Sequence, residues 1–465
     1  MTLATGGTKL RASVLYGGLV AAFLVVAIDP ARADSTERID LETNGGQLAT
    51  LHGFVLSRDG HFAFVAGQTK DPRATCDTFF VRDLTTGHTS CARLNLPARF
   101  GVAVRLAGAS FSGRFVLLQV QPERNTGALL IWDRDTGETD QIDIHPDGLP
   151  SDEPGPAAVS ADGRFVAFTA ARRRPDETEP RCVEGVSRCN DVYLRDRARQ
   201  TTERVSVAWR GGDPDGSSGD PSVSDDGRFV AFGSTAGDIV PGNAKACDFE
   251  SIAVRCTPDV FLWDRHRGTS IKVIKPSGFR RRNTGARGVL DPSGRFVDYV
   301  VALPTTVSES AGGQRLYRYD VARRTTRFLF RAPDEGIVDL PVSADARFVA
   351  FAAPYLGPPY MFLGLEVRNR VQGLFLRDRF AGSVRQIDVA PDGSPPMSSR
   401  LTAVGTPARP TVDFAGISAS GGVVAFTSDA ANLVMDDTNG TTDAFVRYID
   451  GAMPRSGTQP ESAGW

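Results

Sequence analysis

Ser160-Ala-Asp-Gly-Arg-Phe-Val-Ala-Phe168 is one of seven variants of a phrase that recurs along the 465-residue chain. The other six lie at 57–64, 111–116, 224–232, 291–297, 343–351 and 418–426. Self-similarity at a spacing of tens of residues indicates an array of similar supersecondary units. The phrase therefore predicts a repeat protein with seven units.

Each phrase predicts a tight turn that leads into a strand. The Asp162-Gly163 step indicates the turn, because glycine reaches a positive φ without a Cβ clash. The following run, Phe165–Phe168, is apolar at successive positions rather than alternating. Both faces of the predicted strand are therefore buried, and a one-sided sheet is excluded.

A second apolar phrase ending in Asp follows each turn, as in Val192-Tyr-Leu-Arg-Asp196. Its other copies lie at 79–83, 129–133, 260–264, 316–320, 374–378 and 444–450. Glycine stands four residues beyond several of these Asp residues, so the Asp can accept turn N–H groups while Gly takes the left-handed conformation. Gln200 and Arg324 replace this glycine, at an expected cost of about 1 kcal/mol or less each.

Two further strands complete each unit. A leading strand such as 221–224 precedes the first turn, and an alternating run such as 202–207 follows the second. Four antiparallel strands, buried on both faces and repeated radially, describe a blade of a β-propeller. We therefore predict an all-β, seven-bladed β-propeller.

The N-terminal segment 35–41 is predicted to complete the last blade. It resembles the fourth strand at 201–207, and Asn44-Gly-Gly46 parallels Arg210-Gly-Gly212. The stretch after Asp450 is too rich in Gly, Pro and Ser to supply that strand. Pairing of the first strand with the last blade would close the ring and remove an open sheet edge.

Residues 1–33 have the pattern of a secretory signal peptide. Basic residues precede an apolar stretch, 14–28, and Ala31-Arg-Ala33 supplies the small residues of a cleavage site. The apolar stretch is short for a membrane-spanning helix, which needs about 20 residues. We expect a signal peptide, a propeller over 34–450 and a flexible tail at 451–465, in a secreted or periplasmic protein without a membrane span after cleavage.

Six cysteines, an even number, lie after the predicted cleavage site. Two pairs fall between the second and third strands of blades three and four, and local spacing favours disulfides there. The favoured pairs are Cys182 with Cys189, Cys247 with Cys256, and Cys76 with Cys91. Other pairings are open, and a zinc site is the alternative, although the chain has no CxxC motif and no His near these loops.

The candidate binding residues are arginines in the predicted loops. A net charge of −2 gives no case for nucleic-acid binding. The short turns share one face of the disc, the turn face, whereas the second-to-third strand loops and inter-blade connections share the other, the loop face, where binding residues usually lie. The candidate binding residues there are Arg172, Arg173, Arg174, Arg181, Arg280, Arg281 and Arg282. Arginine forks hold carboxylate or phosphate, which favours a small anionic ligand or an envelope or secreted protein as partner. A solvated loop balanced by Asp176, Glu177 and Glu179 is the alternative.

Two other segments have alternative interpretations. Oxygen ligands alternate in Asp437-Thr-Asn-Gly-Thr-Thr-Asp443, as in a calcium loop, but no later acidic residue completes an EF-type loop. Turn capping by Asp437 and Asn439, with Asp443 starting a strand, is favoured, and no metal or cofactor is expected. The apolar segment Tyr355–Leu363 fits either a protein-docking patch or packing against a neighbouring blade.

The Ser-x-Asp-Gly-Arg-Phe-Val-Ala-Phe phrase, the strand ending in Arg/Trp-Asp and Ser428-Asp-Ala-Ala-Asn-Leu-Val434 together resemble the TolB-type, WD-like propeller repeat of bacterial envelope proteins. The resemblance spans 39–450 and implies an exported propeller with a binding role. TolB itself carries an α/β domain before its propeller, whereas only a strand precedes the repeats here. Prolyl-peptidase relatives carry a hydrolase domain that this chain lacks, so no catalytic residue is transferred.

No GxSxG elbow, HExxH helix or Walker loop occurs in the chain. We therefore expect a non-catalytic binding scaffold in the cell envelope or outside the cell. The alternative is a propeller enzyme, a hydrolase or lyase acting on a polysaccharide or lactone, with its site where the central channel opens on the loop face.

Overall fold

The computed structural model describes residues 35–70, 78–92, 94, 103–121, 127–151, 154–172, 189–243, 247–248, 255–256, 258–273, 286–302, 314–332, 342–356, 360–362, 365–367, 370–398, 412–435 and 437–449. Within this part, the regular structure consists of strands alone. Among the described residues, no helix has the length and apolar character needed to span a membrane.

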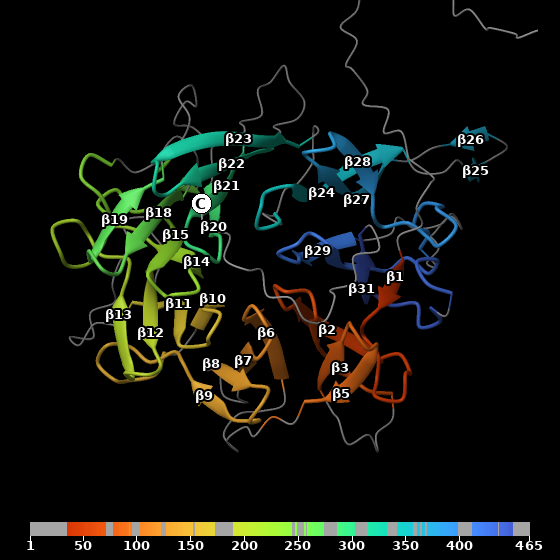
Figure 1. Ribbon diagram of the computed structural model, residues 1–465, viewed down its shortest axis with the longest axis horizontal. Helices are drawn as coiled ribbons and strands as arrows, with labels where there is room; N and C mark the ends of the chain where they lie inside the picture. Colours follow the sequence, from red (N-terminus) through yellow and green to blue (C-terminus); the bar gives the residue numbers. More distant parts are fainter. Residues whose placement is uncertain are drawn as a thin grey trace, which may run out of the picture.

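The strands form seven blades arranged in a ring, as the sequence predicts (Figure 1). Blade one comprises β2 (Thr50–Leu56), β3 (Phe62–Gln68), β4 (Phe79–Asp83) and β5 (His88–Cys91). Blade two comprises β6 (Ala103–Ala109), β7 (Phe115–Gln121), β8 (Ala128–Asp133) and β9 (Thr139–Gln141). Blade three comprises β10 (Pro154–Val159), β11 (Phe165–Ala171), β12 (Asn190–Asp196) and β13 (Thr201–Arg204). Blade four comprises β14 (Ser218–Val223), β15 (Phe229–Ser234), β18 (Asp259–Asp264) and β19 (Thr269–Lys272).

The remaining blades continue the ring. Blade five comprises β20 (Ala286–Leu290), β21 (Phe296–Ala302), β22 (Gln314–Asp320) and β23 (Thr325–Arg331). Blade six shows three strands in its described part: β24 (Phe348–Leu356), β27 (Arg370–Asp378) and β28 (Ser383–Gln386). Blade seven comprises β29 (Val412–Ile417), β30 (Val423–Ser428), β31 (Asp443–Tyr448) and β1 (Thr36–Arg38). Small hairpins extend two of the loops: β16 (Cys247–Asp248) with β17 (Arg255–Cys256) in blade four, and β25 (Tyr360–Phe362) with β26 (Leu365–Val367) in blade six.

The predicted closure of the ring is confirmed. Strand β1 pairs antiparallel with β31, and Arg38 lies opposite Phe445. The Ile39 N–H donates to Ala444 O at 2.9 Å, and the Tyr448 N–H donates to Ser35 O at 3.0 Å. The first described residues therefore supply the outer strand of the last blade and cover its edge.

The hydrophobic core lies between neighbouring blades. The middle strands are buried on both faces, as in β11, where the side chains from Phe165 to Ala170 are all buried. Alternate side chains of one strand contact the blade on either side: Val166 and Phe168 pack toward blade two, and Phe165 and Ala167 toward blade four. Seven such clusters form a continuous ring of apolar contacts, which explains why the strands are not amphipathic.

Side-chain hydrogen bonds explain the Ser-x-Asp-Gly part of the phrase. Ser160 Oγ donates to Asp162 Oδ1 at 2.7 Å and accepts the N–H of Phe165 at 3.0 Å. Asp162 Oδ1 also accepts the N–H of Arg164, and Gly163 takes a φ of +72°. Serine and aspartate thus satisfy the backbone of a turn that only a residue at positive φ can complete.

The second turn also matches the prediction. Asp83 accepts the N–H groups of Thr85 and Thr86 at 2.8 and 3.1 Å, while Gly87 takes a φ of +69°. Gln200 and Arg324 adopt the same left-handed conformation, each at +54°. The surrounding sheet therefore holds two non-glycine residues in a conformation that they avoid elsewhere.

The glycine of the first turn also packs against the preceding blade. A Cβ added to Gly163 would lie 2.3 Å from the ring of Phe115, and one added to Gly227 would lie 2.0 Å from the ring of Phe165. The same contact closes the ring, because a Cβ on Gly60 would lie 3.3 Å from Val423 in blade seven. Glycine is thus required here for space as well as for φ.

Candidate functional site

The turn face is bonded internally by a repeated Arg–Asp pair. In four blades, the arginine that follows the turn glycine, or Ala346 in blade six, binds the Asp that ends the third strand. The pairs are Arg114–Asp133 at 2.9 Å, Arg164–Asp196 at 2.8 Å, Arg228–Asp264 at 3.0 Å and Arg347–Asp378 at 2.6 Å. The Arg114 and Arg164 guanidinium groups hold the pKa values of Asp133 and Asp196 below their usual range.

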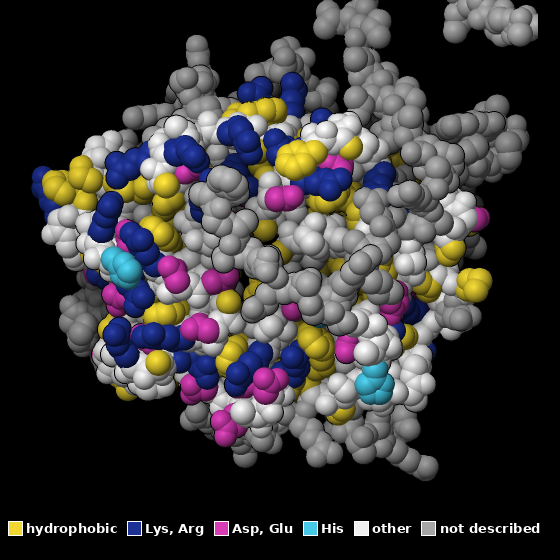
Figure 2. Space-filling model, viewed as in Figure 1, with side chains coloured by type: hydrophobic (Ala, Val, Ile, Leu, Met, Phe, Trp, Pro, Cys, Tyr) yellow, Lys and Arg dark blue, Asp and Glu magenta, His cyan; other side chains and the backbone are white. Residues whose placement is uncertain are grey.

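Arginines also link neighbouring blades by stacking on the phenylalanine of the phrase. Arg164, which belongs to the same blade as Phe165, lies over the Phe165 ring with its guanidinium carbon 4.6 Å from the ring centroid. Arg265, which belongs to blade four, lies over the same ring at 4.3 Å. Arg197 and Arg134 make the same inter-blade contact on Phe115 and Phe62. Figure 2 shows basic and acidic side chains interspersed around the ring on the face it presents. Many arginines of the chain thus have a structural role that their number alone does not reveal.

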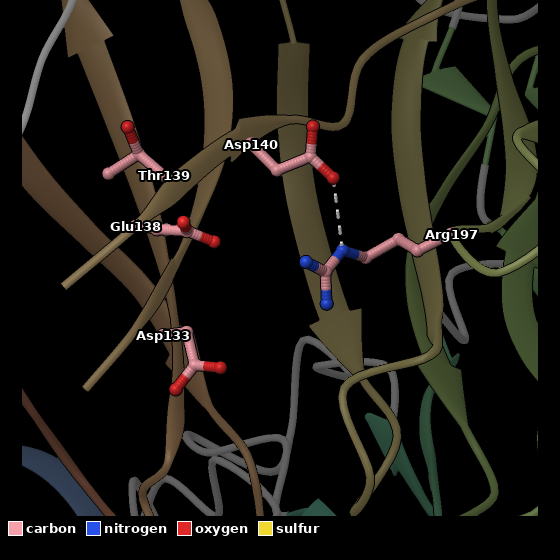
Figure 3. A pocket seen from close by; sticks show the side chains of 5 residues that line it. All are labelled: Asp133, Glu138, Thr139, Asp140 and Arg197. Carbon is pink, nitrogen blue, oxygen red and sulfur yellow. Dashed lines mark hydrogen bonds and ion pairs between the residues drawn. The ribbon is translucent and has the colours of Figure 1, made fainter. Parts of the chain in front are cut away.

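A cavity of about 440 Å³ opens on the turn face between blades two and three. It is lined by Asp133, Glu138, Thr139, Asp140 and Arg197 (Figure 3). Arg197 Nε lies 3.4 Å from Asp140 Oδ2, and Arg197 Nη1 donates to Gly163 O at 2.9 Å. Its charged groups are largely committed to neighbours, so the geometry is that of a groove lined by surface ion pairs.

The loop face of blade three contains a buried ion cluster. Arg172 binds Asp191 in bidentate fashion, with Nε–Oδ2 at 2.8 Å and Nη2–Oδ1 at 3.1 Å. Arg204 also contacts Asp191, at 3.5 Å, and Ser206 Oγ donates to Asp191 Oδ1 at 3.0 Å. Asp191 and Arg172 are both buried. Arg172, one of the predicted binding residues, thus fixes the start of the loop rather than presenting its guanidinium to solvent.

A second cavity, of about 250 Å³, lies on the loop face beside this cluster, between blades three and four. It is lined by Pro156, Thr169, Asn190, Ser217, Ser218, Gly219, Asp220, Gly233 and Pro258. Thr169 and Asn190 lie at the two ends of the 173–188 segment, and Gly233 and Pro258 flank the corresponding loop of blade four. The cavity is therefore framed by the stems of the two loops that contain the predicted local cysteine pairs.

Polar and apolar groups share the lining of this loop-face cavity. Thr169 is buried, and its Oγ1 has no hydrogen-bond partner among the described residues. Ser217 Oγ accepts the N–H of Asn190 at 3.1 Å, and Ser218 Oγ donates to Ser234 Oγ at 2.8 Å. The position of the cavity at the stems of two long loops makes it a candidate site in the described part of the chain.

Arg38 binds two aspartates of the predicted calcium-like segment, Asp437 and Asp443. Arg38 Nε lies 3.0 Å from Asp40 Oδ1, Arg38 Nη1 lies 3.3 Å from Asp437 Oδ1, and Arg38 Nη2 contacts Asp443. Asn439 Oδ1 accepts the N–H of Thr441 at 3.1 Å, and Asp443 begins β31, as the capping interpretation predicts. Among the described residues, no group of three or more His, Cys, Asp or Glu side chains is arranged to hold a metal ion.

Two of the six cysteines are described with their side chains, Cys91 and Cys189, and each is disulfide-bonded. Their predicted partners, Cys76 and Cys182, lie outside the described residues. Cys247 and Cys256 lie directly opposite each other on β16 and β17. The complete pairing stays a prediction.

The other predicted binding arginines, Arg173, Arg174, Arg181, Arg280, Arg281 and Arg282, lie outside the described residues. The predicted signal peptide and the tail at 451–465 also lie outside them. In the apolar segment 355–363, Tyr355 packs edge-on against Phe375 at 6.1 Å and joins the core between blades five and six. For Tyr355, packing is thus the interpretation that applies.

Sequence reasoning missed a buried aspartate that follows the fourth strand of a blade and accepts an N–H near the start of the third strand. Asp388 Oδ1 accepts the N–H of Leu374 at 3.0 Å, and Asp40 Oδ1 accepts that of Ala444 at 3.3 Å. In blade three Ser206 Oγ takes this place, accepting the N–H of Val192. The recurrence of Gln141-Ile-Asp143, Gln386-Ile-Asp388 and Arg38-Ile-Asp40 is the signal that could have revealed it.

This arrangement predicts a pH-dependent stability. Burial raises the pKa of Asp388 to about 7, and burial together with the neighbouring Asp40 raises that of Asp443 to about 7. In the folded state these carboxyls bind protons that the unfolded chain releases near pH 4, so they lower the free energy of unfolding as pH rises from about 4 to about 7. Asp388→Asn should remove part of this slope in denaturant titrations across that range.

Asp392→Asn serves as the control for that measurement. Asp392 is exposed in the same inter-blade connection, and hydrogen bonds from Ser394 lower its pKa. It is therefore already ionised between about pH 5 and 7, and its replacement should leave the slope in that range unchanged. Equal slopes for wild type and Asp388→Asn would contradict the assignment to Asp388.

Comparison with known proteins identifies the fold but no family. No protein-family model matches the chain, and no curated protein matches it. Among solved structures, an oligogalacturonate lyase in complex with manganese is 13% identical, with 90% of this chain and 97% of that chain covered and a TM-score of 0.50. Oligogalacturonate lyase from Vibrio parahaemolyticus is 11% identical over the same shares, with a TM-score of 0.51. TolB from Acinetobacter baumannii is also a neighbour, at 15% identity, covering 85% of this chain and 78% of that chain with a TM-score of 0.35.

The blades, their closure and these neighbours define the chain as a seven-bladed β-propeller. At such identities the likeness to the lyases is one of fold alone.

Proposed function

We propose that this protein is an exported, non-catalytic propeller that binds a partner or ligand on its loop face, between blades three and four. The observation that carries the proposal is the cavity of about 250 Å³ at the stems of the two loops that contain the predicted local cysteine pairs. The turn face, by contrast, uses its described arginines and aspartates to bond the blades to themselves and to one another. Binding by loops on a rigid scaffold is the usual arrangement in such folds.

Location outside the cytoplasm forms part of the proposal. The signal-peptide pattern at 1–33 supports it, and so do the disulfide-bonded Cys91 and Cys189, since disulfides persist in oxidising compartments. The arginines of the 173–188 segment carry the charge that would recognise an acidic surface on a soluble or envelope protein.

Neutralising Arg173, Arg174 and Arg181 together by replacement with serine should reduce partner capture at least tenfold without lowering the Tm. These residues follow a fixed stem, whereas Arg172→Ala should lower the Tm because it leaves Asp191 without its bidentate partner. The measurement is cross-linked capture from an envelope extract, repeated by titration with the purified partner. Unchanged capture by the triple variant would show that the partner binds to another surface.

An enzyme remains the second candidate, because two oligogalacturonate lyases share the fold across 90% of this chain. Incubating the purified protein with oligogalacturonate and with lactones, with and without manganese or calcium, tests it. Appearance of the ultraviolet absorbance of an unsaturated uronate, or of lactone opening, would replace the scaffold proposal. The absence of turnover together with saturable partner binding would support it.

A further inference from the structure

We propose that β23, the outer strand of blade five, docks an extended segment of a partner protein whose side chains alternate between acidic and apolar. The partner segment lies along the rim of the disc and extends the sheet of blade five by one strand. This surface is separate from the loop-face cavity, so the inference goes beyond the proposed function. Three features of β23 support it: the length of its edge, the side chains on its two faces, and the charge gathered beside it.

The edge of β23 is long for this ring. Strand β23 has seven residues and ends the strand order of its sheet. In the described part of the chain, the outer strands of the other six blades have three or four residues each. Figure 1 shows β23 on the outside of the ring. A sheet edge presents backbone N–H and C=O groups with which an extended chain can pair, so β23 offers the longest described template.

The register places the backbone groups of Phe328 on the outer side of β23. The Ala332 N–H donates to Gln314 O at 2.9 Å, and hydrogen-bonded and non-hydrogen-bonded pairs alternate along an antiparallel ladder from there. Three residues along β22 from Gln314, Tyr317 stands in a non-hydrogen-bonded pair, and Phe328 lies opposite it. The N–H and C=O of Phe328 therefore face away from β22, where an added strand would lie.

The two faces of β23 carry different side chains beside this edge. Phe328 is 52% exposed, and its ring packs edge-on against Tyr317 at 5.7 Å, on the side of blade four. Arg327 is exposed and lies on the other face, because it pairs with Arg318, whose guanidinium donates to Ala344 O of blade six. An added strand would thus meet an aromatic ring on one face and an arginine on the other.

Arginines from two blades gather on the blade-six side of β23. Arg379, in the turn after β27, donates its Nε proton to Leu329 O of β23 at 3.1 Å. Burial and the charges of Arg327, Arg318 and Arg377 lower the pKa of Arg379. Figure 2 shows basic side chains beside hydrophobic ones over this part of the ring. Carboxylates placed here would offset the repulsion between the arginines, so the complementary partner is acidic.

The two faces set the pattern of the partner segment. Successive side chains of a strand point to opposite faces, so an apolar residue opposite Phe328 covers its ring. The residues on either side of it then place carboxylates beside Arg327 and Arg379. A second copy of β23 would bring arginine against arginine, which disfavours pairing of this edge with itself. Backbone pairing supplies affinity in this mode of recognition, and the alternating side chains supply specificity.

The probe is a fluorescein-labelled peptide of seven residues in which glutamate alternates with valine. Its binding to the mature protein is measured by fluorescence anisotropy. Three control peptides each remove one feature. The first has lysine in place of glutamate, and the second has the same composition with the glutamates and valines in separate blocks. In the third, alternate backbone amides are N-methylated and cannot pair with the edge. We expect saturable binding of the alternating peptide, and at least tenfold weaker binding of each control.

Arg327→Glu should weaken binding of the alternating peptide at least tenfold. Arg199→Glu is the matched control, because Arg199 lies in blade three, is 68% exposed and gives the same change in net charge. Phe328→Ala and Phe328→Pro separate the ring from the backbone: both remove the ring, but only proline removes the outward N–H, at a position where an edge strand tolerates it. We expect at least tenfold weaker binding by Phe328→Pro than by Phe328→Ala. If Phe328→Pro lowers the Tm, the N-methylated peptide measures the same pairing.

Three outcomes would overturn the inference: no saturable binding of the alternating peptide, equal binding of any control peptide, or equal affinities in Arg327→Glu and Arg199→Glu. The arginines would then serve to keep other chains off the edge. Binding to phosphatidylglycerol vesicles that is lost in Arg327→Glu, without binding of the peptide, would assign them to a membrane surface instead. The variant at Arg173, Arg174 and Arg181 should bind the peptide as wild type does, so this test fails or succeeds independently of the proposed function.

Discussion

Gly227→Ala is expected to lower the free energy of unfolding by about 3 to 5 kcal/mol. Gly227 has a φ of +63°, so any side chain there carries backbone strain. Its Cβ would also lie 2.0 Å from the ring of Phe165 in blade three. That ring is buried and held between Arg164 and Arg265, so it cannot move aside without breaking an inter-blade contact.

Gly268→Ala separates strain from crowding. Gly268 has nearly the same φ, +62°, but a Cβ there would meet nothing within 4 Å. We expect it to cost about 1 kcal/mol, the amount that left-handed backbone alone requires. Denaturant unfolding of both variants provides the comparison, and equal losses would show that the blade contact does not matter.

Blade six shows that the crowding is specific to each interface. Ala346 takes the place of the turn glycine there, with a φ of +58°, and is fully buried between blades five and six. Blade five carries the buried Asp298–Arg318 pair where blades three and four carry an alanine opposite a leucine. The interface between blades five and six is thus built differently, and it accommodates the methyl group of Ala346. At Gly227 there is no room for such a methyl group.

Arg38→Met is expected to destabilise the closure of the ring by about 3 to 5 kcal/mol at about pH 8. The Arg38 guanidinium lies among three aspartates, Asp40, Asp437 and Asp443, whose side chains are at most 2% exposed. Removing the one cation among the described residues that contacts all three leaves these buried carboxylates without that counter-charge. Strand β1 has only three residues, so the loss should free it from β31.

The loss from Arg38→Met should shrink as the pH falls toward about 4. Burial already raises the pKa values of Asp40 and Asp443, and without Arg38 they rise further. In the folded variant the carboxyls then bind protons that the unfolded chain has released, so its stability falls more steeply with pH than that of wild type. Denaturant unfolding and hydrogen exchange of 36–38 across this range test the claim.

Arg114→Met is the matched control for Arg38→Met. Arg114 binds Asp133 in the same bidentate fashion, but its side chain is 45% exposed. An exposed pair of this kind contributes about 0–1 kcal/mol. A pH-independent loss in Arg38→Met, or one no larger than that of Arg114→Met, would show that the buried cluster does not hold the ring closed.

The two faces of the disc thus differ in how their polar groups are used. On the turn face, the phrases of blades two, three, four and six each supply an arginine to the aspartate of their own blade, and in several blades the arginine after that aspartate stacks on a ring of the preceding blade. On the loop face, a cavity of about 250 Å³ lies between blades three and four.

The sequence by itself determined the number of blades, the turns and the closing strand. These depend on local chemistry: Asp162-Gly163 needs its turn whatever surrounds it, and continuous apolar runs need burial on both faces. The likeness of 35–41 to 201–207 could be read because repeated units must have repeated strands. Spacing between neighbours in the chain carries this information.

Only the tertiary structure decided which polar groups have a partner and which do not. Arg172 was predicted to bind a ligand, but its burial depends on Asp191, which a loop brings back to it. The sequence did not indicate that the Thr169 hydroxyl lacks a hydrogen-bond partner among the described residues. Whether it has one depends on the residues of β12 and β14 that pack around it. Satisfaction of a buried polar group is a property of three-dimensional surroundings, and those are assembled from segments that sequence spacing does not place together.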